Sequence, residues 1–361
     1  MDLVATLEEL SNLCALSGHE EPVIGYMKER LAPFADSLSV DNLGNVTCVI
    51  RGSGDSLAPA MVFAHMDEVG LMVKKVESDG YLRFVRVGGI PERVLQGQRV
   101  ILTGKKGLLP GVIGAKSHHV TQADEKYKVV PFQDCYVDIG ARSKAEVTAM
   151  GIHVGTPVTY APGFARLPGG RIVGKAMDNR AGCLALLALA ERLSRERAKI
   201  DVAVVATVQE EFNIRGALPS AYALNPVLGI CLDVAVAHDT PDLKNDADLS
   251  VGDGPAVGHY SFHGRGTLGG LIPHPALRSG VEATAERLGI SFQRNVFFGG
   301  LADSSFLQLV REGIPAVDIG VPCRYTHSPV ETIHLADLES MIHLVFQYLQ
   351  ELPARPSFRR G

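Results

Sequence analysis

The sequence lacks two features that would have pointed to particular classes of protein. Its 361 residues include no tryptophan, the side chain that most readily stacks on sugars, and this argues against a glycan-binding cleft. It also has no apolar run of about 18 residues, the length that a membrane-spanning helix requires. We therefore expect no membrane-embedded segment and rank glycan hydrolysis low among the possible functions.

Positive charge and cysteine motifs are also scarce. The formal net charge is −5, which argues against nucleic acid as the main partner. The first ten residues carry acids within an apolar pattern and no basic start, so they predict a helix rather than a signal peptide. The six cysteines are scattered without a C-x-x-C pair. Reduced thiols in a cytoplasmic protein fit this distribution best.

The order of apolar patterns predicts an α/β protein interrupted by a β-rich insertion. Helical spacing covers 3–16, 22–31, 183–193, 275–288, 302–312 and 335–349, a hairpin is expected over 38–50, and buried strands over 58–64, 202–208, 227–232, 292–298 and 315–321. Between residues 71 and 168, short β-rich runs alternate with Gly and Pro, which is typical of a small barrel or sandwich. We therefore predict a discontinuous catalytic domain, 1–70 and 169–352, an inserted domain, 71–168, and a flexible tail, 353–361.

One predicted strand, 202–208, leads into the adjacent acids Glu210 and Glu211. The carboxyl ends of strands in open α/β sheets border the crevice where ligands bind. Two neighbouring carboxylates repel each other there unless a cation or a proton lies between them. The pair therefore suggests one metal ligand and one proton carrier.

Other predicted strand ends and turns carry similar side chains. They are His65 and Asp67, Asp178, Asp233 and His327. Two histidines with several carboxylates form a nitrogen and oxygen ligand set that suits Zn, Co or Mn, and the absence of thiolates favours a catalytic metal. This many ligands would suit two ions that share a carboxylate. In the His65-x-Asp67 motif, Asp67 can orient the imidazole. The remaining histidines, His263 among them, are expected to be structural.

Four motifs in this order resemble the TET-type, glutamyl-aminopeptidase-like metallopeptidases, some of which are labelled endoglucanases. The motifs are Ala64–Gly70 (AHMDEVG), Gly174–Arg180 (GKAMDNR), Val208–Glu211 (VQEE) and Arg324–Pro329 (RYTHSP). The resemblance covers nearly the whole chain and implies a three-layer α/β/α zinc-peptidase-like catalytic domain with an inserted small β-barrel-like domain. It also implies that the insertion forms dimers, which would build a hollow tetrahedral dodecamer.

The same resemblance implies a role for each candidate residue. Asp178 would bridge two divalent ions, with zinc expected and cobalt or manganese as alternatives. His65 and Asp233 would bind one ion, and Glu211 and His327 the other. Glu210 would be the general base, with Asp67 supporting His65.

One residue and two short segments depart from the family pattern. Asn179 stands where many relatives have a second aspartate, and it is not an expected ligand. The segment 212–216 differs directly after the two glutamates, and the segment 301–304 differs near the expected substrate pocket. The preferred side chain of the substrate therefore does not follow from the resemblance.

These features predict a metal-dependent aminopeptidase that hydrolyses the N-terminal residue of short peptides. A metal-activated water would attack the scissile carbonyl, and Glu210 would carry its proton to the leaving amine. Two alternatives use the same residues: a deacylase of N-acyl amino acids or amino sugars, and a metal-stabilised assembly protein with little catalysis. Glycan hydrolysis ranks last, because the carboxylates are committed to metals.

Overall fold

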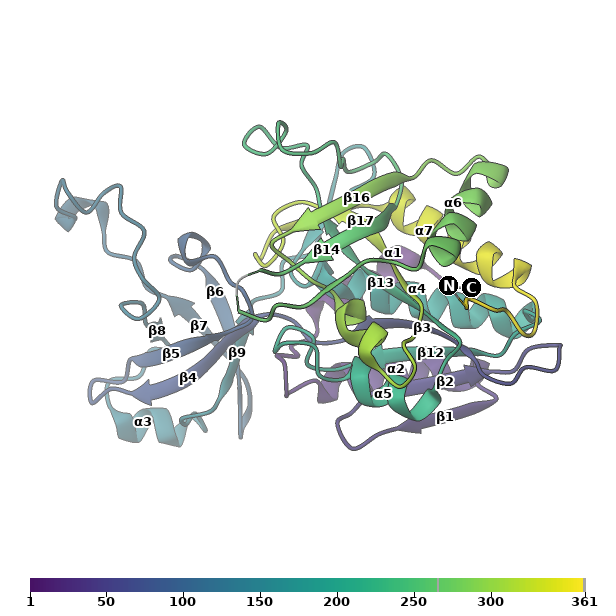
Figure 1. The fold of residues 1–361 in the computed structure, drawn as a ribbon. Coiled ribbons are helices and arrows are strands. Elements are labelled where there is room, and N and C mark those ends of the chain that lie inside the picture. The colour runs from purple at the N-terminus through teal and green to yellow at the C-terminus, as the bar shows by residue number, and fades with distance from the viewer. Residues whose placement is uncertain (265, 360–361) are drawn as a thin grey trace.

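The computed structural model describes residues 1–264 and 266–359. Its centre is a mixed nine-stranded sheet in the order β1-β2-β12-β3-β13-β17-β14-β15, with β16 paired to β14 (Figure 1). The strands are β1 (Ser37–Val40), β2 (Val46–Ile50), β3 (Ala60–His65), β12 (Val202–Thr207), β13 (Leu228–Val236), β14 (Ala256–Phe262), β15 (Gly270–Leu271), β16 (Gln293–Phe298) and β17 (Ala316–Cys323). The central strands β12, β3, β13 and β17 are parallel, as their nearly continuous apolar runs predict.

Helices cover both faces of this sheet. The larger core lies under α1 (Leu3–Asn12), α2 (Glu21–Leu31), α4 (Met177–Arg195), α6 (Pro275–Leu288) and α7 (Leu335–Glu351). The opposite face packs against α5 (Ala217–Leu224) and a 3₁₀ helix, η4 (Asp303–Leu309). The predicted three-layer α/β/α architecture is therefore confirmed, with one outer layer much thicker than the other.

A closed six-stranded barrel follows β3 in the chain and forms the second lobe in Figure 1. Its strands, in order around the barrel, are β4 (Gly70–Val76), β5 (Leu82–Val87), β8 (Val137–Asp138), β7 (Gly107–Ile113), β6 (Arg99–Gly104) and β9 (Pro157–Tyr160). It has its own apolar core, which includes Leu82, Leu102 and Val158. Short helices η2 (Glu92–Val94), η3 (His118–Val120) and α3 (Lys144–Ala149) accompany it. The predicted barrel-like insertion is confirmed, whereas its boundaries and its role in dimerisation remain predictions.

The chain returns from the barrel through a small sheet. Its strands are β10 (Ala165–Leu167), β11 (Arg171–Gly174) and β18 (Glu331–His334). β11 leads directly into the turn before α4, and β18 follows the loop that carries His327. The small sheet thus places these two segments side by side.

The predicted helix over 302–312 is wrong: only the 3₁₀ helix η4 (Asp303–Leu309) forms. Polar side chains at its start bond elsewhere, since the buried Asp303 carboxylate accepts from the Thr207 hydroxyl and the Ala302 N–H donates to Ser305 Oγ at 3.2 Å. Such bonds compete with the regular helical pattern. The segment ends at Val310, whose backbone is extended, and left-handed backbone follows at Arg311. The last residues of β12 also differ from expectation, because the strand stops at Thr207 and a turn carries the two glutamates.

The described part of the C-terminal segment contacts the catalytic lobe. Phe358 packs against the larger core, and Arg355 pairs with Asp55. Residues 360–361 of the predicted tail lie outside the described residues. Within the described ranges, no helix is both long and apolar enough to cross a membrane.

Candidate metal centre and substrate pocket

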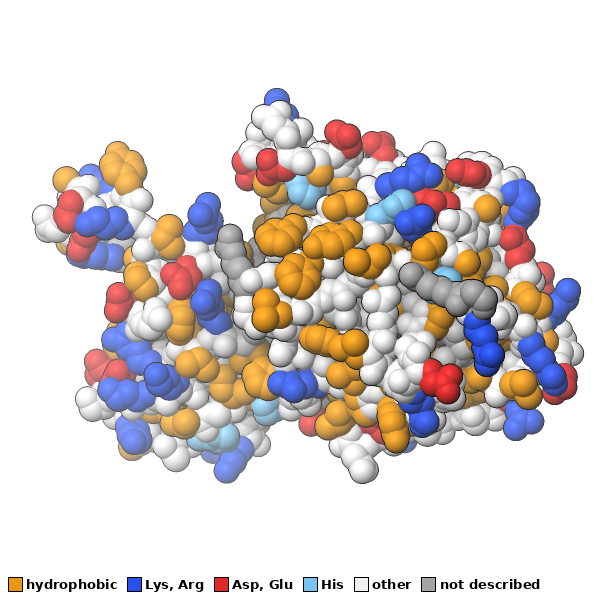
Figure 2. Space-filling model, viewed as in Figure 1, with side chains coloured by type: hydrophobic (Ala, Val, Ile, Leu, Met, Phe, Trp, Pro, Cys, Tyr) orange, Lys and Arg blue, Asp and Glu red, His pale blue; other side chains and the backbone are white. Residues whose placement is uncertain are grey.

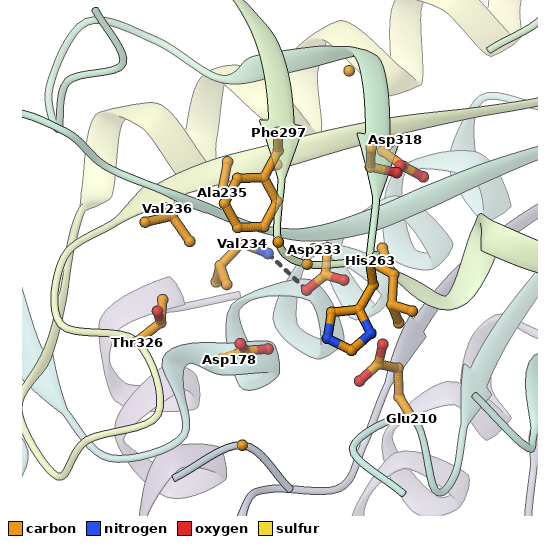
Figure 3. A pocket seen from close by; sticks show the side chains of 18 of the residues that line it. Asp178, Glu210, Asp233, Val234, Ala235, Val236, His263, Phe297, Asp318 and Thr326 are labelled. Carbon is orange, nitrogen blue, oxygen red and sulfur yellow. Dashed lines mark hydrogen bonds between the residues drawn. The ribbon is translucent and has the colours of Figure 1, made fainter. Parts of the chain in front are cut away.

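The structure brings the predicted site residues into one pocket at the carboxyl ends of the central strands. His65 ends β3, Asp233 lies on β13, and Glu210 and Glu211 follow β12. Asp178 comes from the start of α4, and His327 from the loop after β17. All six line a cavity of about 480 Å³, and Asp67 lies buried beside it. Figure 3 shows the Asp178, Asp233 and Glu210 side chains around this space.

Potential ligand atoms form two groups that share one residue. His65, Asp178 and Asp233 form one group, and Asp178, Glu211 and His327 form the other; within each group the atoms all lie within 4.8 Å of one another. His65 Nε2 lies 3.1 Å from Asp178 Oδ1 and 3.8 Å from Asp233 Oδ1. His327 Nε2 lies 3.2 Å from Glu211 Oε1 and 3.4 Å from Asp178 Oδ2. The two oxygens of Asp178 thus face the two histidines.

The Asp67 carboxylate fixes the positions of the two glutamates and of His65 relative to one another. The Asp67 carboxylate accepts hydrogen bonds from the backbone N–H groups of Glu210 and Glu211, each at 3.0 Å. Asp67 Oδ1 lies 3.5 Å from His65 Nδ1. It also accepts from the Ser17 hydroxyl. A single buried carboxylate therefore fixes elements from three parts of the chain.

Glu210 belongs to neither ligand group, although it lies beside both. Its Oε2 is 4.0 Å from His65 Nε2, and the residue is only 8 % exposed. A left-handed turn at Gln209 carries the chain from β12 to this position. The Glu210 carboxylate thus faces the pocket but belongs to neither group of potential ligand atoms.

Burial and crowding change how these groups titrate. Burial raises the pKa of Glu210, Glu211 and Asp233, and acidic neighbours add to the rise while the histidines oppose it. Burial also opposes ionisation of Asp178, but hydrogen bonds from His327 and His65 hold its pKa below the ordinary value. The pocket thus contains more carboxylates than the two histidines of the ligand groups can neutralise.

The turn that carries Asp178 is fixed by buried polar contacts. Ala176 has left-handed backbone, and the regular part of α4 begins only after Asn179. The Asn179 side chain accepts from the Gly182 N–H at 2.9 Å and donates to the Leu232 carbonyl at 2.8 Å. It therefore caps the helix and joins it to β13, which accounts for an amide at this position.

Glu331 is a functional candidate that the sequence did not reveal. This residue is 1 % exposed, and its carboxylate accepts from the Asp178 N–H at 2.9 Å and from the His327 N–H at 2.6 Å. It thereby ties together the two segments whose side chains meet in the second ligand group. No spacing in the sequence indicates this link, because the link depends on how β18 pairs with β11.

The far wall of the pocket contains further residues that sequence reasoning did not assign to the site. They include His263, Asn295, Phe297 and Asp318, contributed by β16, β17 and the segment after β14. Strands β16 and β17 were predicted, and the alternation of side chains along β16 would have indicated that Asn295 and Phe297 share a face. His263 was expected to be structural, whereas Figure 3 shows its ring within the pocket.

The donor set fits divalent metal ions. Carboxylate oxygens and imidazole nitrogens suit Zn, Co and Mn, and the two groups meet at a shared carboxylate as two-ion sites do. The surplus of buried acids provides the negative charge that such ions would offset. The groups lie at the carboxyl ends of parallel strands, where open α/β sheets bind their ligands.

Comparison with known proteins identifies the family. The M42 glutamyl aminopeptidase family matches residues 44–344. The putative aminopeptidase SgcX of Escherichia coli is 41% identical over 340 residues, covering 94% of this chain and 91% of SgcX. An aminopeptidase structure from Desulfurococcus kamchatkensis has a TM-score of 0.91 at 38% identity, covering 98% of this chain and 95% of that one. The TET1 peptidase of Pyrococcus horikoshii, which can assemble into a tetrahedron or a large octahedral shell, has a TM-score of 0.86 at 30% identity, covering 97% and 100%.

The chain therefore belongs to the M42 glutamyl aminopeptidase family, and it is a hydrolase of the peptidase class. This confirms the resemblance based on the four motifs. Membership also implies divalent metal ions as cofactors, in agreement with the two ligand groups.

Proposed function

We propose that this protein is a two-metal aminopeptidase that hydrolyses the N-terminal residue of short peptides. His65 and Asp233 would hold one ion, Glu211 and His327 the other, and Asp178 would bridge them. The observation that carries the proposal is the pair of ligand groups joined at Asp178, with Glu210 close by but outside both. Zinc is the expected metal, with cobalt and manganese as alternatives.

Ions bound there would supply Lewis acidity, which lowers the pKa of a water molecule and polarises the scissile carbonyl. Glu210 takes the proton from the attacking water and then gives it to the leaving amine, so that the peptide C–N bond breaks and the base is regenerated. Asp67 holds the backbone of Glu210 and orients His65. The surrounding acids favour a substrate whose free α-amine is positively charged.

A peptide assay tests the proposal. The purified protein is loaded separately with Zn, Co or Mn and incubated with matched free and N-acetylated peptides, and the product masses are recorded. We expect stepwise loss of N-terminal residues from the free peptides alone. Release of acetate would instead identify a deacylase. Absence of turnover with every metal would favour an assembly or binding protein.

Assembly is a second part of the proposal. We expect the barrel to form dimers and the dimers to form a dodecamer in the cytoplasm, and the architecture shared with the P. horikoshii TET1 peptidase supports this. Native mass spectrometry should record a particle of twelve chain masses that separates into dimers at low concentration. A protein that stays monomeric at all concentrations would contradict this part and leave the assignment of chemistry intact.

A further inference from the structure

The pocket continues beyond the ligand groups along β17, where Asp318 forms part of its wall. The register pairs Asp318 with Cys231 and Gly320 with Asp233. Residues advance by about 3.3 Å along a parallel strand, so Asp318 lies roughly 7 Å along the sheet from the level of Asp233. Alternation places Asp318, Gly320 and Asp233 on the same face of the sheet. In Figure 3, Asp233 lies between Asp178 and Asp318.

A glycine lines the pocket at the level of Asp233. Gly320 is the next residue on this face, and a Cβ there would lie 2.9 Å from the Ala235 Cβ. Phe297 and Ala235 add apolar surface to the same pocket. The pocket wall that includes Asp318 therefore also offers apolar surface to a substrate side chain.

Asp318 differs from the other acids of the pocket, because it belongs to neither ligand group and lies away from Glu210. Its Oδ1 is buried and has no hydrogen-bond partner among the described residues. Burial raises its pKa to about 6, and the Ser304 hydroxyl opposes that rise, so the carboxylate is largely ionised at neutral pH. Among the residues that the structure describes, no lysine or arginine lines the pocket. The buried Oδ1 thus lacks a partner within the described part of the chain, and a cation from the substrate would pair with it.

We propose that Asp318 selects peptides with a basic N-terminal residue, by pairing with its side-chain ammonium or guanidinium group. The aliphatic stem of lysine would lie along Phe297 and Ala235, with its charge at Asp318. This inference rests on the proposed aminopeptidase function and specifies its substrate class.

The test compares substrates that differ by one charge. Lysine and norleucine p-nitroanilides have side chains of similar length and the same free α-amine, and only the lysine compound carries a cation on its side chain. The wild-type enzyme should have the higher kcat/KM for lysine. Asp318→Asn should lower the lysine-to-norleucine ratio of kcat/KM by about 10- to 100-fold, as expected for loss of a hydrogen bond between charged groups. An unchanged ratio, or a wild-type enzyme without a preference for lysine, would overturn the proposal.

Asp303→Asn is the matched control, because Asp303 is a buried carboxylate nearby that does not line the pocket. It should affect both substrates equally. Calorimetric titration with lysinamide and norleucinamide provides a readout that needs no turnover: wild type should bind lysinamide more tightly, and Asp318→Asn should remove the difference. If the protein cleaves neither p-nitroanilide yet shows this binding difference, the proposed chemistry fails and the role of Asp318 stands.

Discussion

Glu210→Gln should reduce kcat by about 10²–10⁴-fold, the usual contribution of general acid–base catalysis. Glutamine has nearly the same shape as glutamate but cannot accept the proton of the attacking water. Since Glu210 lies outside both ligand groups, the metal content per subunit should stay close to that of the wild type. Steady-state kinetics on a free peptide, combined with elemental analysis of the same sample, measures both quantities. A variant that keeps most of its turnover would contradict the proposed role of Glu210 as the general base.

Glu20→Gln is a suitable control for this experiment. Glu20 is also buried, with a pKa raised to about 7 by burial and by Asp67, and its carboxylate accepts from the Gln209 N–H at 3.1 Å. It therefore contacts the same turn without lining the pocket. We expect its kcat to remain within about tenfold of the wild-type value, since no proton transfer depends on it. An equal loss in both variants would mean that Glu210 acts by holding the turn rather than by moving a proton.

The sequence predicted the central strands and the residues at their ends because both depend on local patterns. Apolar runs identify buried strands, and a carboxylate after such a run is visible without a structure. The convergence of His65, Glu211 and Asp233 could be expected because parallel strands share a carboxyl edge. The sequence was less informative at η4, where the Asp303 side chain bonds to Thr207 rather than following the helical pattern.

Residues that act through tertiary contacts could not be predicted in the same way. Glu331 contacts the Asp178 and His327 backbones only because β18 pairs with β11. Asp318 lies within the predicted strand 315–321, and only the register against β13 shows how far it lies from Asp233. Both roles depend on distances between strands. The residue pattern of a single sequence does not reveal such distances.

Asp178→Asn should prevent binding of both ions, which makes it the most damaging single change that we predict in the ligand set. Asp178 is the residue common to the two groups, and its two oxygens face His65 and His327 separately. An amide has one carbonyl oxygen and no charge, so it cannot serve both ions. We expect near-complete loss of metal and of turnover, measured by elemental analysis after dialysis and by peptide hydrolysis.

Asp233→Asn provides the comparison that makes this result interpretable. Asp233 belongs only to the group with His65 and Asp178, so its variant should lose one ion and retain the other. The metal-free wild type should also have a lower Tm than the loaded protein, because ligands that bind only the folded state stabilise it and because its buried acids then lack counter-charges. If Asp178→Asn and Asp233→Asn retain the same number of ions, Asp178 does not bridge, and the two groups are independent sites.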